Sequence, residues 1–381
     1  MSNKMVVNET SYHGYGAIND IPNEAKARGF KKALLVCDKE LIEFGVVKKV
    51  TDLLDNAKLS YEVFSDLKAN PSIKNVQDGV DAFKKANADY IIAVGGGSPI
   101  DTAKGVGIIV TNPTFADVIS LEGLAETKNK SVPIFAVPTT AGTAAEVTIN
   151  YVITDEEKQR KMVCVDANDI PVVAFVDPDM MSTMPKGLTA ATGMDALTHA
   201  IEGYITAGAF PFSDLLHIKA IELIASSLRG AVNNTKEGRE GMALGQYVAG
   251  MGFSNAGLGI VHSMAHPLGA LYDTPHGIAN AIILPTVMKY NAEATGEKYK
   301  DIAQVMGVDV TNMSQDQYRK AAIDAVKKLS SDIGIPENLK DIVKKEDIPF
   351  LAESAFNDAC RGGNPRETSI EEIAKLYESL I

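Results

Sequence analysis

The chain has 381 residues, of which 45% are hydrophobic and 23% charged, a composition typical of a folded globular protein and not of a disordered or fibrous one. Its 37 basic and 49 acidic side chains give a formal net charge of −12, which argues against nucleic acid as the main partner and against a polybasic membrane anchor. Neither a signal-like start nor an apolar run of about 18 residues is present, and the three cysteines suggest neither a disulfide framework nor a cysteine zinc site. We therefore expect a cytoplasmic protein without a membrane partner, and the length predicts two domains.

The first half of the chain contains short apolar runs typical of strands and, between two of them, a segment with the spacing of a helix. Residues 73–88 carry Val76, Val80 and Phe83 along one side of a predicted helix. Continuous β-branched and apolar runs favour strands that are covered on both faces. The predicted strands are 32–38, 61–67, 89–97, 132–140 and 171–177. This order predicts a mostly parallel α/β sheet.

The second half shows helical patterns only. The predicted helices are 190–205, 213–232, 241–272, 277–294, 315–333, 348–360 and 369–380. Glycines 250, 252, 257 and 259 should divide 241–272 into two helices, and Ser314 with Gln317 and Thr368 with Glu371 match capping boxes. We therefore predict a Rossmann-like parallel-sheet domain over residues 1–185 and an all-helical domain over 186–381.

A glycine turn follows the strand predicted at 89–97. After Gly95, Gly96 and Gly97, Ser98 is the predicted N-cap of a helix, with Pro99 at its first position and Asp101 at its third. Glycines allow close approach to a ligand, and a helix N-terminus offers free N–H groups, so the segment predicts a pyrophosphate site. The pattern is not G-x-G-x-x-G, and a tight turn without a ligand is the alternative interpretation.

Two other strand ends carry polar residues. Asp38 ends the strand 32–38, where a carboxylate would accept hydrogen bonds from a ribose 2′-hydroxyl and repel a 2′-phosphate. This favours NAD over NADP. The run 138–148 places Thr139, Thr140 and Thr143 after another strand, at the sheet edge where α/β proteins bind ligands. A solvated strand end and a threonine-rich loop are the alternatives.

Four of the six histidines, His199, His262, His266 and His276, have other histidines or a carboxylate at helical spacing or close by, whereas His13 and His217 have no such company. Asp195 and His199 are four residues apart on a predicted helix, His262 and His266 repeat that spacing, and His276 follows. Imidazoles with a carboxylate suit Fe²⁺ or Zn²⁺, although histidines that line a helical core would show the same pattern. A nucleotide site before a metal site predicts hydride transfer to or from a carbonyl, with the metal as Lewis acid.

The chain resembles the iron-dependent alcohol dehydrogenases over essentially its whole length. The segments GGGSPID, PTTAGTAAEVT, DALTHAIEGY, GLGIVHSMAHPLGA and TPHG match that family in order and spacing. The resemblance implies oxidation and reduction of short alcohols and aldehydes with NAD and Fe²⁺, Zn²⁺ remaining open. Short neutral substrates such as lactaldehyde and 1,2-propanediol are favoured, because no basic cluster suits a substrate phosphate. It also implies a homodimer.

The resemblance also assigns roles to individual positions. The metal ligands would be Asp195, His199, His262 and His276. His266 would be catalytic and would relay a proton or position substrate, with Asn150 and Phe253 lining the substrate region. The cofactor contacts would be Asp38, Asn70, Gly96, Gly97, Ser98, Asp101, Thr139, Thr140, Thr143, Asn150 and Lys161.

Two positions bear on the resemblance, and related enzyme classes are the alternatives to it. Ala69 stands where the family often has proline before Asn70, and Cys360 matches a cysteine near the active-site mouth of relatives. A free cysteine is more often a small buried hydrophobe. One alternative is another iron-type alcohol dehydrogenase that acts on a different short-chain alcohol. A second is a glycerol dehydrogenase or a dehydroquinate synthase-like lyase, since these enzymes also join a nucleotide-binding domain to a helical metal domain, usually with zinc. A non-enzymatic scaffold role is the weaker rival, because the ligand set is complete.

Overall fold

The computed structural model describes residues 2–158 and 160–381, which cluster into two compact units. An α/β unit contains residues 5–140 and 144–183, and a helical unit contains 184–381 together with 2–4 and 141–143. Within the described residues, no helix is both long and apolar enough to cross a membrane. Each unit is built from the elements that follow.

The α/β unit is built on a six-stranded sheet in which every neighbouring pair of strands is parallel. The strand order is β1-β9-β6-β4-β2-β3. The strands are β1 (Thr10–His13), β2 (Lys32–Cys37), β3 (Ser60–Phe64), β4 (Tyr90–Gly95), β6 (Ile134–Pro138) and β9 (Val173–Val176). The predicted parallel sheet is confirmed, and each predicted strand is present with slightly shorter bounds.

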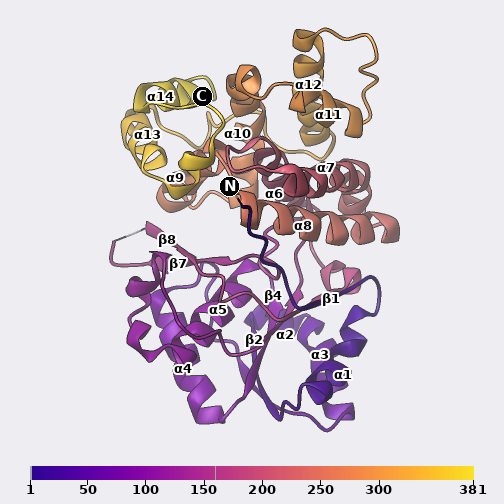
Figure 1. Cartoon of the computed structure of the whole chain (residues 1–381), viewed down its shortest axis with the longest axis vertical. Helices are drawn as coiled ribbons and strands as arrows, with labels where there is room; N and C mark the ends of the chain where they lie inside the picture. The colour runs from indigo at the N-terminus through magenta and orange to yellow at the C-terminus, as the bar shows by residue number, and fades with distance from the viewer. Residues whose placement is uncertain (1, 159) are drawn as a thin grey trace. The chain divides into compact units, whose positions relative to one another are not determined.

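Helices cover both faces of this sheet, so alternate residues of one strand enter two different cores. On β2, Leu34 and Val36 pack with α4 and α5, whereas Ala33 and Leu35 pack with α1 and α3. Figure 1 shows these two helix layers on opposite sides of the strands. The helices are α1 (Ile21–Ala27), α2 (Lys39–Glu43), α3 (Val46–Asn56), α4 (Ile73–Ala86) and α5 (Gly97–Thr111). Burial on both faces explains why the central strands lack polar alternation.

The sequence did not predict β1 or a second, three-stranded sheet. That sheet has the order β5-β8-β7, with β5 at Gly123–Leu124, β7 at Asn150–Asp155 and β8 at Arg160–Val165. β7 and β8 form an antiparallel hairpin. Only every second residue of β7 is buried, and no residue of β1 is, so neither strand shows the continuous apolar run on which the prediction relied.

The helical unit contains no strand among its described residues, as predicted. Its helices are α6 (Lys186–Ile205), α7 (Pro211–Val232), α8 (Lys236–Ala256), α9 (Ile260–Tyr272), α10 (His276–Asn291), α11 (Lys298–Val305), α12 (Gln315–Asp332), α13 (Ile348–Phe356) and α14 (Ile370–Glu378). The expected break between α8 and α9 is confirmed, and Gly257 adopts φ +99° there. The short helix α11 was not predicted. The segment predicted over 348–360 ends at Phe356, and Cys360 lies in a following 3-10 turn.

One of the two capping boxes is confirmed and the other is displaced by one residue. Ser314 accepts from the backbone N–H of Gln317, whose side chain returns the bond. At α14 the reciprocal pair is Ser369 with Glu372, so the prediction of Thr368 with Glu371 is wrong. Both pairs have the same spacing, and only the helix register distinguishes them.

Candidate active site

The ends of three neighbouring strands meet at one edge of the α/β sheet. Cys37 of β2 pairs with Val94 of β4, so Asp38 follows at the level of the glycine turn. Gly95 pairs with Pro138 of β6, and the Thr139 N–H donates to the Gly95 carbonyl at 2.9 Å. The register therefore brings Asp38, the glycine turn and the threonine run side by side at the carboxyl edge of the sheet.

The glycines of the turn are required by close packing. A Cβ atom on Gly95 would lie 2.4 Å from Pro99 Cγ, and one on Gly96 would lie 3.2 Å from Thr140 Cγ2. Helix α5 begins at Gly97 with Gly96 as its N-cap, so the predicted N-cap Ser98 is wrong and Ser98 lies inside the first turn. Its first N–H groups carry the partial positive charge expected at a helix start.

Asp38 is a partly buried carboxylate at the N-cap of α2, although its side chain makes no capping hydrogen bond. Burial raises its pKa to about 6, with a smaller contribution from Glu40. A hydroxyl donor that hydrogen-bonds to the carboxylate would oppose this shift. The position and the charge suit a ribose hydroxyl, as the sequence predicts.

Asp101 has a structural contact that the prediction did not include. One carboxylate oxygen accepts from the Val152 N–H of β7 at 3.1 Å, and burial raises the pKa of Asp101 to about 6. The carboxylate therefore ties α5 to the second sheet. This bond does not test the predicted contact with a cofactor, so the contact of Asp101 with NAD stays a prediction.

Asn70 and Lys161 come together from distant parts of the α/β unit. Lys161 Nζ donates to Asn70 Oδ1 at 3.0 Å, and Asn70 has the left-handed φ of +58°. The Thr154 N–H holds the adjacent loop by donating to the Pro71 carbonyl at 2.7 Å. Ala69 stands where the family often has a stiffer proline. The loop that carries Asn70 and Pro71 is nevertheless held in place by hydrogen bonds from the hairpin β7–β8.

A buried lysine fixes the start of β7, where Asn150 lies. Lys104 Nζ donates to the carbonyl of Thr148 at 2.6 Å, to its hydroxyl at 3.0 Å and to the carbonyl of Asn150 at 2.8 Å. Thr143 belongs to the short segment that clusters with the helical unit, where Gly142 packs against Thr192. The predicted cofactor residues are thus divided between the two units.

Three helices of the helical unit bring the predicted metal ligands together. Asp195 and His199 lie on α6, His262 lies on α9, and His276 is the first residue of α10. Asp195 Oδ1 lies 3.8 Å from His262 Nε2 and 3.6 Å from His276 Nε2, and His199 Nδ1 lies 4.0 Å from Asp195 Oδ2. A tetrahedral metal with bonds of about 2.0–2.2 Å would require donor separations of roughly 3.3–3.6 Å. Asp195, His262 and His276 approach that geometry, with ligand atoms within 4.8 Å of one another, whereas His199 lies at the edge of this group.

The surroundings of this cluster fit a cation. Asn280 Nδ2 lies 2.7 Å from Asp195 Oδ1, 3.1 Å from His276 Nε2 and 3.3 Å from His262 Nε2. An amide has two protons for these three acceptors, whereas a divalent metal accepts several donors at once. The buried Nδ1 of His199 has no hydrogen-bond partner among the described residues. A transition metal would be coordinated by the carboxylate oxygen of Asp195 and by imidazole nitrogens, which all have lone pairs to offer.

Electrostatics favour the ligating state of Asp195 and His199, whereas burial would lower the pKa of His262 but its bond with Glu202 raises it. Burial alone would raise the pKa of Asp195, but the neighbouring histidines lower it, and its carboxylate is ionised at neutral pH. Burial lowers the pKa of His199 to about 4, so its imidazole is neutral. Phe253 stacks on the His199 ring at 4.2 Å between centroids, which covers one side of the cluster with an apolar face.

His266 lies beside the metal ligands and contacts a carboxylate that the sequence analysis missed. Its ring stacks on His276 at 5.3 Å, and its Nδ1 lies 2.7 Å from Asp358 Oδ2. Burial by itself would raise the pKa of Asp358, but the His266 bond and other contacts lower it to about 2. Asp358 lies 92 residues after His266, so no local spacing could indicate the pair.

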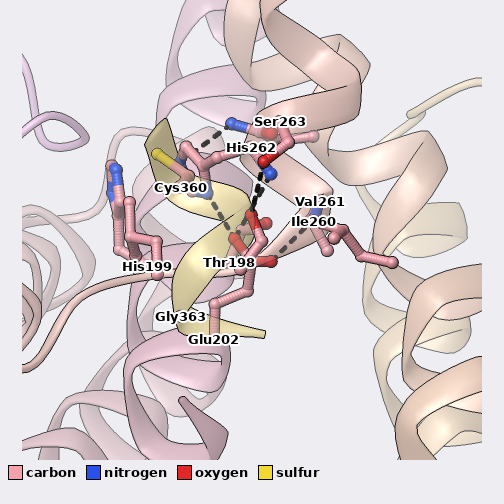
Figure 2. A network of polar contacts seen from close by, with 12 residues as sticks. Thr198, His199, Glu202, Ile260, Val261, His262, Ser263, Cys360 and Gly363 are labelled. Atoms are coloured by element: carbon pink, nitrogen blue, oxygen red, sulfur yellow. Dashed lines mark hydrogen bonds and ion pairs between the residues drawn. The ribbon is translucent and has the colours of Figure 1, made fainter. Parts of the chain in front are cut away.

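Glu202 was also missed, although a signal was present. Glu202 lies seven residues after Asp195 and three after His199 on α6, and these spacings put the three residues on one side of the helix. Figure 2 shows His199 and Glu202 on this helix. The Glu202 carboxylate is buried and contacts His262 Nδ1 at 2.5 Å. Helical spacing from Asp195 would have identified it.

Comparison with known proteins agrees with this geometry. The chain matches "Iron-containing alcohol dehydrogenase" over residues 8–178 and "Fe-containing alcohol dehydrogenase family, C-terminal" over residues 189–381. It is 61% identical over 380 residues to lactaldehyde reductase of Escherichia coli (strain K12), and the alignment covers 100% of both chains. The crystal structure of a 1,3-propanediol oxidoreductase has a TM-score of 0.97 and 43% identity, covering 100% of both chains.

A third relative was solved with a nucleotide. The sulfoacetaldehyde reductase from Bifidobacterium kashiwanohense, in complex with NAD+, has a TM-score of 0.90 and 28% identity, and covers 100% of this chain and 99% of its own. The two family matches together span most of the chain. The chain therefore belongs to the iron-containing alcohol dehydrogenase family.

Proposed function

We propose that this chain is an NAD-dependent, iron-dependent oxidoreductase that interconverts short aldehydes and alcohols, with lactaldehyde and 1,2-propanediol as its substrates. The observation that carries the chemistry is the convergence of Asp195, His262 and His276 within one unit, with His199 beside Asp195. The substrate rests on the 61% identity to lactaldehyde reductase. Such a pair of cofactors supplies polarisation of a carbonyl and a hydride for its carbon.

The α/β unit would bind the nucleotide. The turn at Gly95–Gly97 and the start of α5 would receive the pyrophosphate, because exposed N–H groups and the helix dipole attract anions. Asp38 would accept from the ribose hydroxyls. Lys161, already held by Asn70, would add a positive charge near the nucleotide. The net charge of −12 is no obstacle, because these contacts are local.

The helical unit would hold the metal and handle the proton. Asp195, His199, His262 and His276 would be the metal ligands, and Phe253 would keep water from the His199 side. Reduction of an aldehyde requires one proton at the oxygen, which His266 would deliver. Asp358 would orient the His266 ring, because a carboxylate accepts from Nδ1–H. Asn150 would contact substrate from the start of β7.

The test combines metal reconstitution with a substrate panel. Metal-free protein is loaded with Fe²⁺ under anaerobic conditions or with Zn²⁺, and NADH or NADPH consumption is followed with lactaldehyde, other short aldehydes, dihydroxyacetone and phosphorylated sugars. We expect turnover with Fe²⁺, NADH and lactaldehyde to exceed the other combinations. Faster turnover with Zn²⁺ and dihydroxyacetone would favour the glycerol dehydrogenase alternative.

The assembly and cellular location belong to the same proposal. The family resemblance favours a homodimer in the cytoplasm, with small molecules as the other partners. Sedimentation velocity of the purified chain should give the mass of two copies. A monomer at assay concentrations would contradict the dimer and would leave the proposed chemistry intact.

A further inference from the structure

The carboxylate of Glu202 lies beneath the N-terminus of α9 and makes three contacts there. Its Oε1 accepts from the Val261 N–H at 2.7 Å, and its Oε2 lies 3.3 Å from the His262 N–H and 2.5 Å from His262 Nδ1 (Figure 2). Both side chains are 2% exposed. The carboxylate therefore caps a helix and contacts a predicted metal ligand at the same time.

The contacts of the Glu202 carboxylate decide which nitrogen of His262 carries the proton. Its oxygens accept from the backbone N–H groups of Val261 and His262, and a carboxylate only accepts hydrogen bonds, so the 2.5 Å contact places the proton on His262 Nδ1. In a neutral imidazole the other nitrogen then keeps its lone pair. That nitrogen, Nε2, lies 3.8 Å from Asp195 Oδ1, on the side of the predicted metal.

The backbone around this contact is shaped to admit the carboxylate. A Cβ atom on Gly259 would lie 2.9 Å from Glu202 Oε1 and 3.1 Å from Asn364 Oδ1. Asn364 Oδ1 also lies 3.5 Å from the Ile260 N–H, so it contacts the same helix end without touching the His262 ring. Glu202 and Asn364 thus share the cap, but only Glu202 reaches the ligand.

We propose that Glu202 is a positioning residue that selects the Nδ1–H tautomer of His262 and so presents Nε2 to the metal. The inference rests on the proposed function for the presence of a metal at this site. Carboxylates that hold the remote nitrogen of a ligating histidine increase metal affinity, and their loss costs about 10–100-fold.

The test is metal affinity in Glu202→Gln. Glutamine keeps an oxygen that accepts from the Val261 N–H, but its amide donates toward His262 Nδ1 and favours the tautomer whose Nε2 carries the proton. Titration of metal-free protein with Co²⁺, followed by the visible absorption of the bound ion, should show affinity reduced about 10–100-fold. Glu202→Asp, which keeps the charge, should recover part of it. Asn364→Ala is the matched control and should lower Tm while Co²⁺ affinity stays close to wild type.

The outcomes separate this inference from the proposed function. Equal Co²⁺ affinity of wild type and Glu202→Gln would overturn the role of Glu202 alone, and absence of metal binding by the wild type would overturn both. If the variants do not fold, nitrogen-15 NMR of histidine-labelled, metal-free wild type decides. His262, assigned with His262→Gln, should appear as the Nδ1–H tautomer, and an Nε2–H tautomer would overturn the proposal.

Discussion

The α/β unit and the helical unit build their candidate sites by different means. In the α/β unit, strand register aligns the ends of β2, β4 and β6, and the key residues are a glycine turn and backbone N–H groups. In the helical unit, side chains from α6, α9 and α10 converge, and buried carboxylates orient them. Ligand binding at the first site depends on the space that the glycines leave free, whereas metal binding at the second depends on the number and orientation of the ligand atoms. Substitutions in the two units should therefore fail in different ways.

The largest effect is expected from His262→Ala. Loss of this ligand should leave the protein folded but reduce metal content and lower kcat/KM with lactaldehyde on the order of 10³-fold, because Lewis-acid stabilisation is worth several kcal/mol. Metal analysis and steady-state assays provide the measurement, and NADH binding should stay intact. His13→Ala on β1 is the control. Full metal content with normal turnover in His262→Ala would refute the ligand assignment.

A smaller loss is expected from Asp358→Asn, which keeps the shape but removes the charge beside His266. We expect kcat to fall about 10²-fold, at the lower end of what a positioned proton donor contributes, with metal content unchanged. Asp309→Asn, which changes an exposed carboxylate of the same unit, should have wild-type kcat. A drop in metal content equal to the drop in kcat would instead place Asp358 among the groups that hold the metal.

The same variant has a defined pH signature in stability. The pKa of Asp358 falls from its usual 3.8 to about 2 in the folded chain, so the pair stabilises the fold above pH 3.8 and loses this contribution as pH falls toward 2. Denaturant unfolding of wild type and Asp358→Asn should therefore differ at neutral pH and converge near pH 2. A constant difference across that range would contradict the linkage.

In the α/β unit, Gly95→Ala should weaken nucleotide binding without affecting the metal. The added Cβ meets the rigid ring of Pro99 at 2.4 Å and must displace the turn, and overpacking of this kind costs about 1–3 kcal/mol. We expect NADH affinity to fall about 10-fold in fluorescence titrations. Gly187→Ala, whose Cβ meets no atom within 4 Å, is the control. Unchanged NADH affinity in Gly95→Ala would separate the turn from the nucleotide.

The smallest effect is expected from Asp38→Gly. Removal of the carboxylate should relieve its repulsion of a 2′-phosphate, worth about 1 kcal/mol for unit charges roughly 4 Å apart in water, and raise kcat/KM with NADPH roughly fivefold. The nearby exposed Glu40→Gln should change coenzyme preference less. An unaltered NADPH to NADH ratio in Asp38→Gly would remove this carboxylate from the coenzyme site.

Local sequence patterns indicated the central strands and the histidine pairs, but not the residues and strands that contact them only in the folded chain. Buried parallel strands and helix spacing leave local patterns, so β2, β4 and the pairs Asp195–His199 and His262–His266 were visible in the chain. Asp358 reaches His266 only through tertiary packing, and β7 buries every second residue. The start of α5 was misplaced because Ser98 and Pro99 have the residue types of an N-cap and a first helical position, whereas the helix begins earlier, at Gly97 with Gly96 as its N-cap.

Asn280 has a consequence for the charge of the predicted metal site. Its amide nitrogen lies among three of the predicted ligands, within 3.3 Å of each. Because this neighbour is a neutral amide, the four predicted ligands carry only the negative charge of Asp195, and a divalent ion held by them would leave a net charge of about +1. That surplus would favour a substrate oxygen on which negative charge develops. A carboxylate in place of the amide would cancel it.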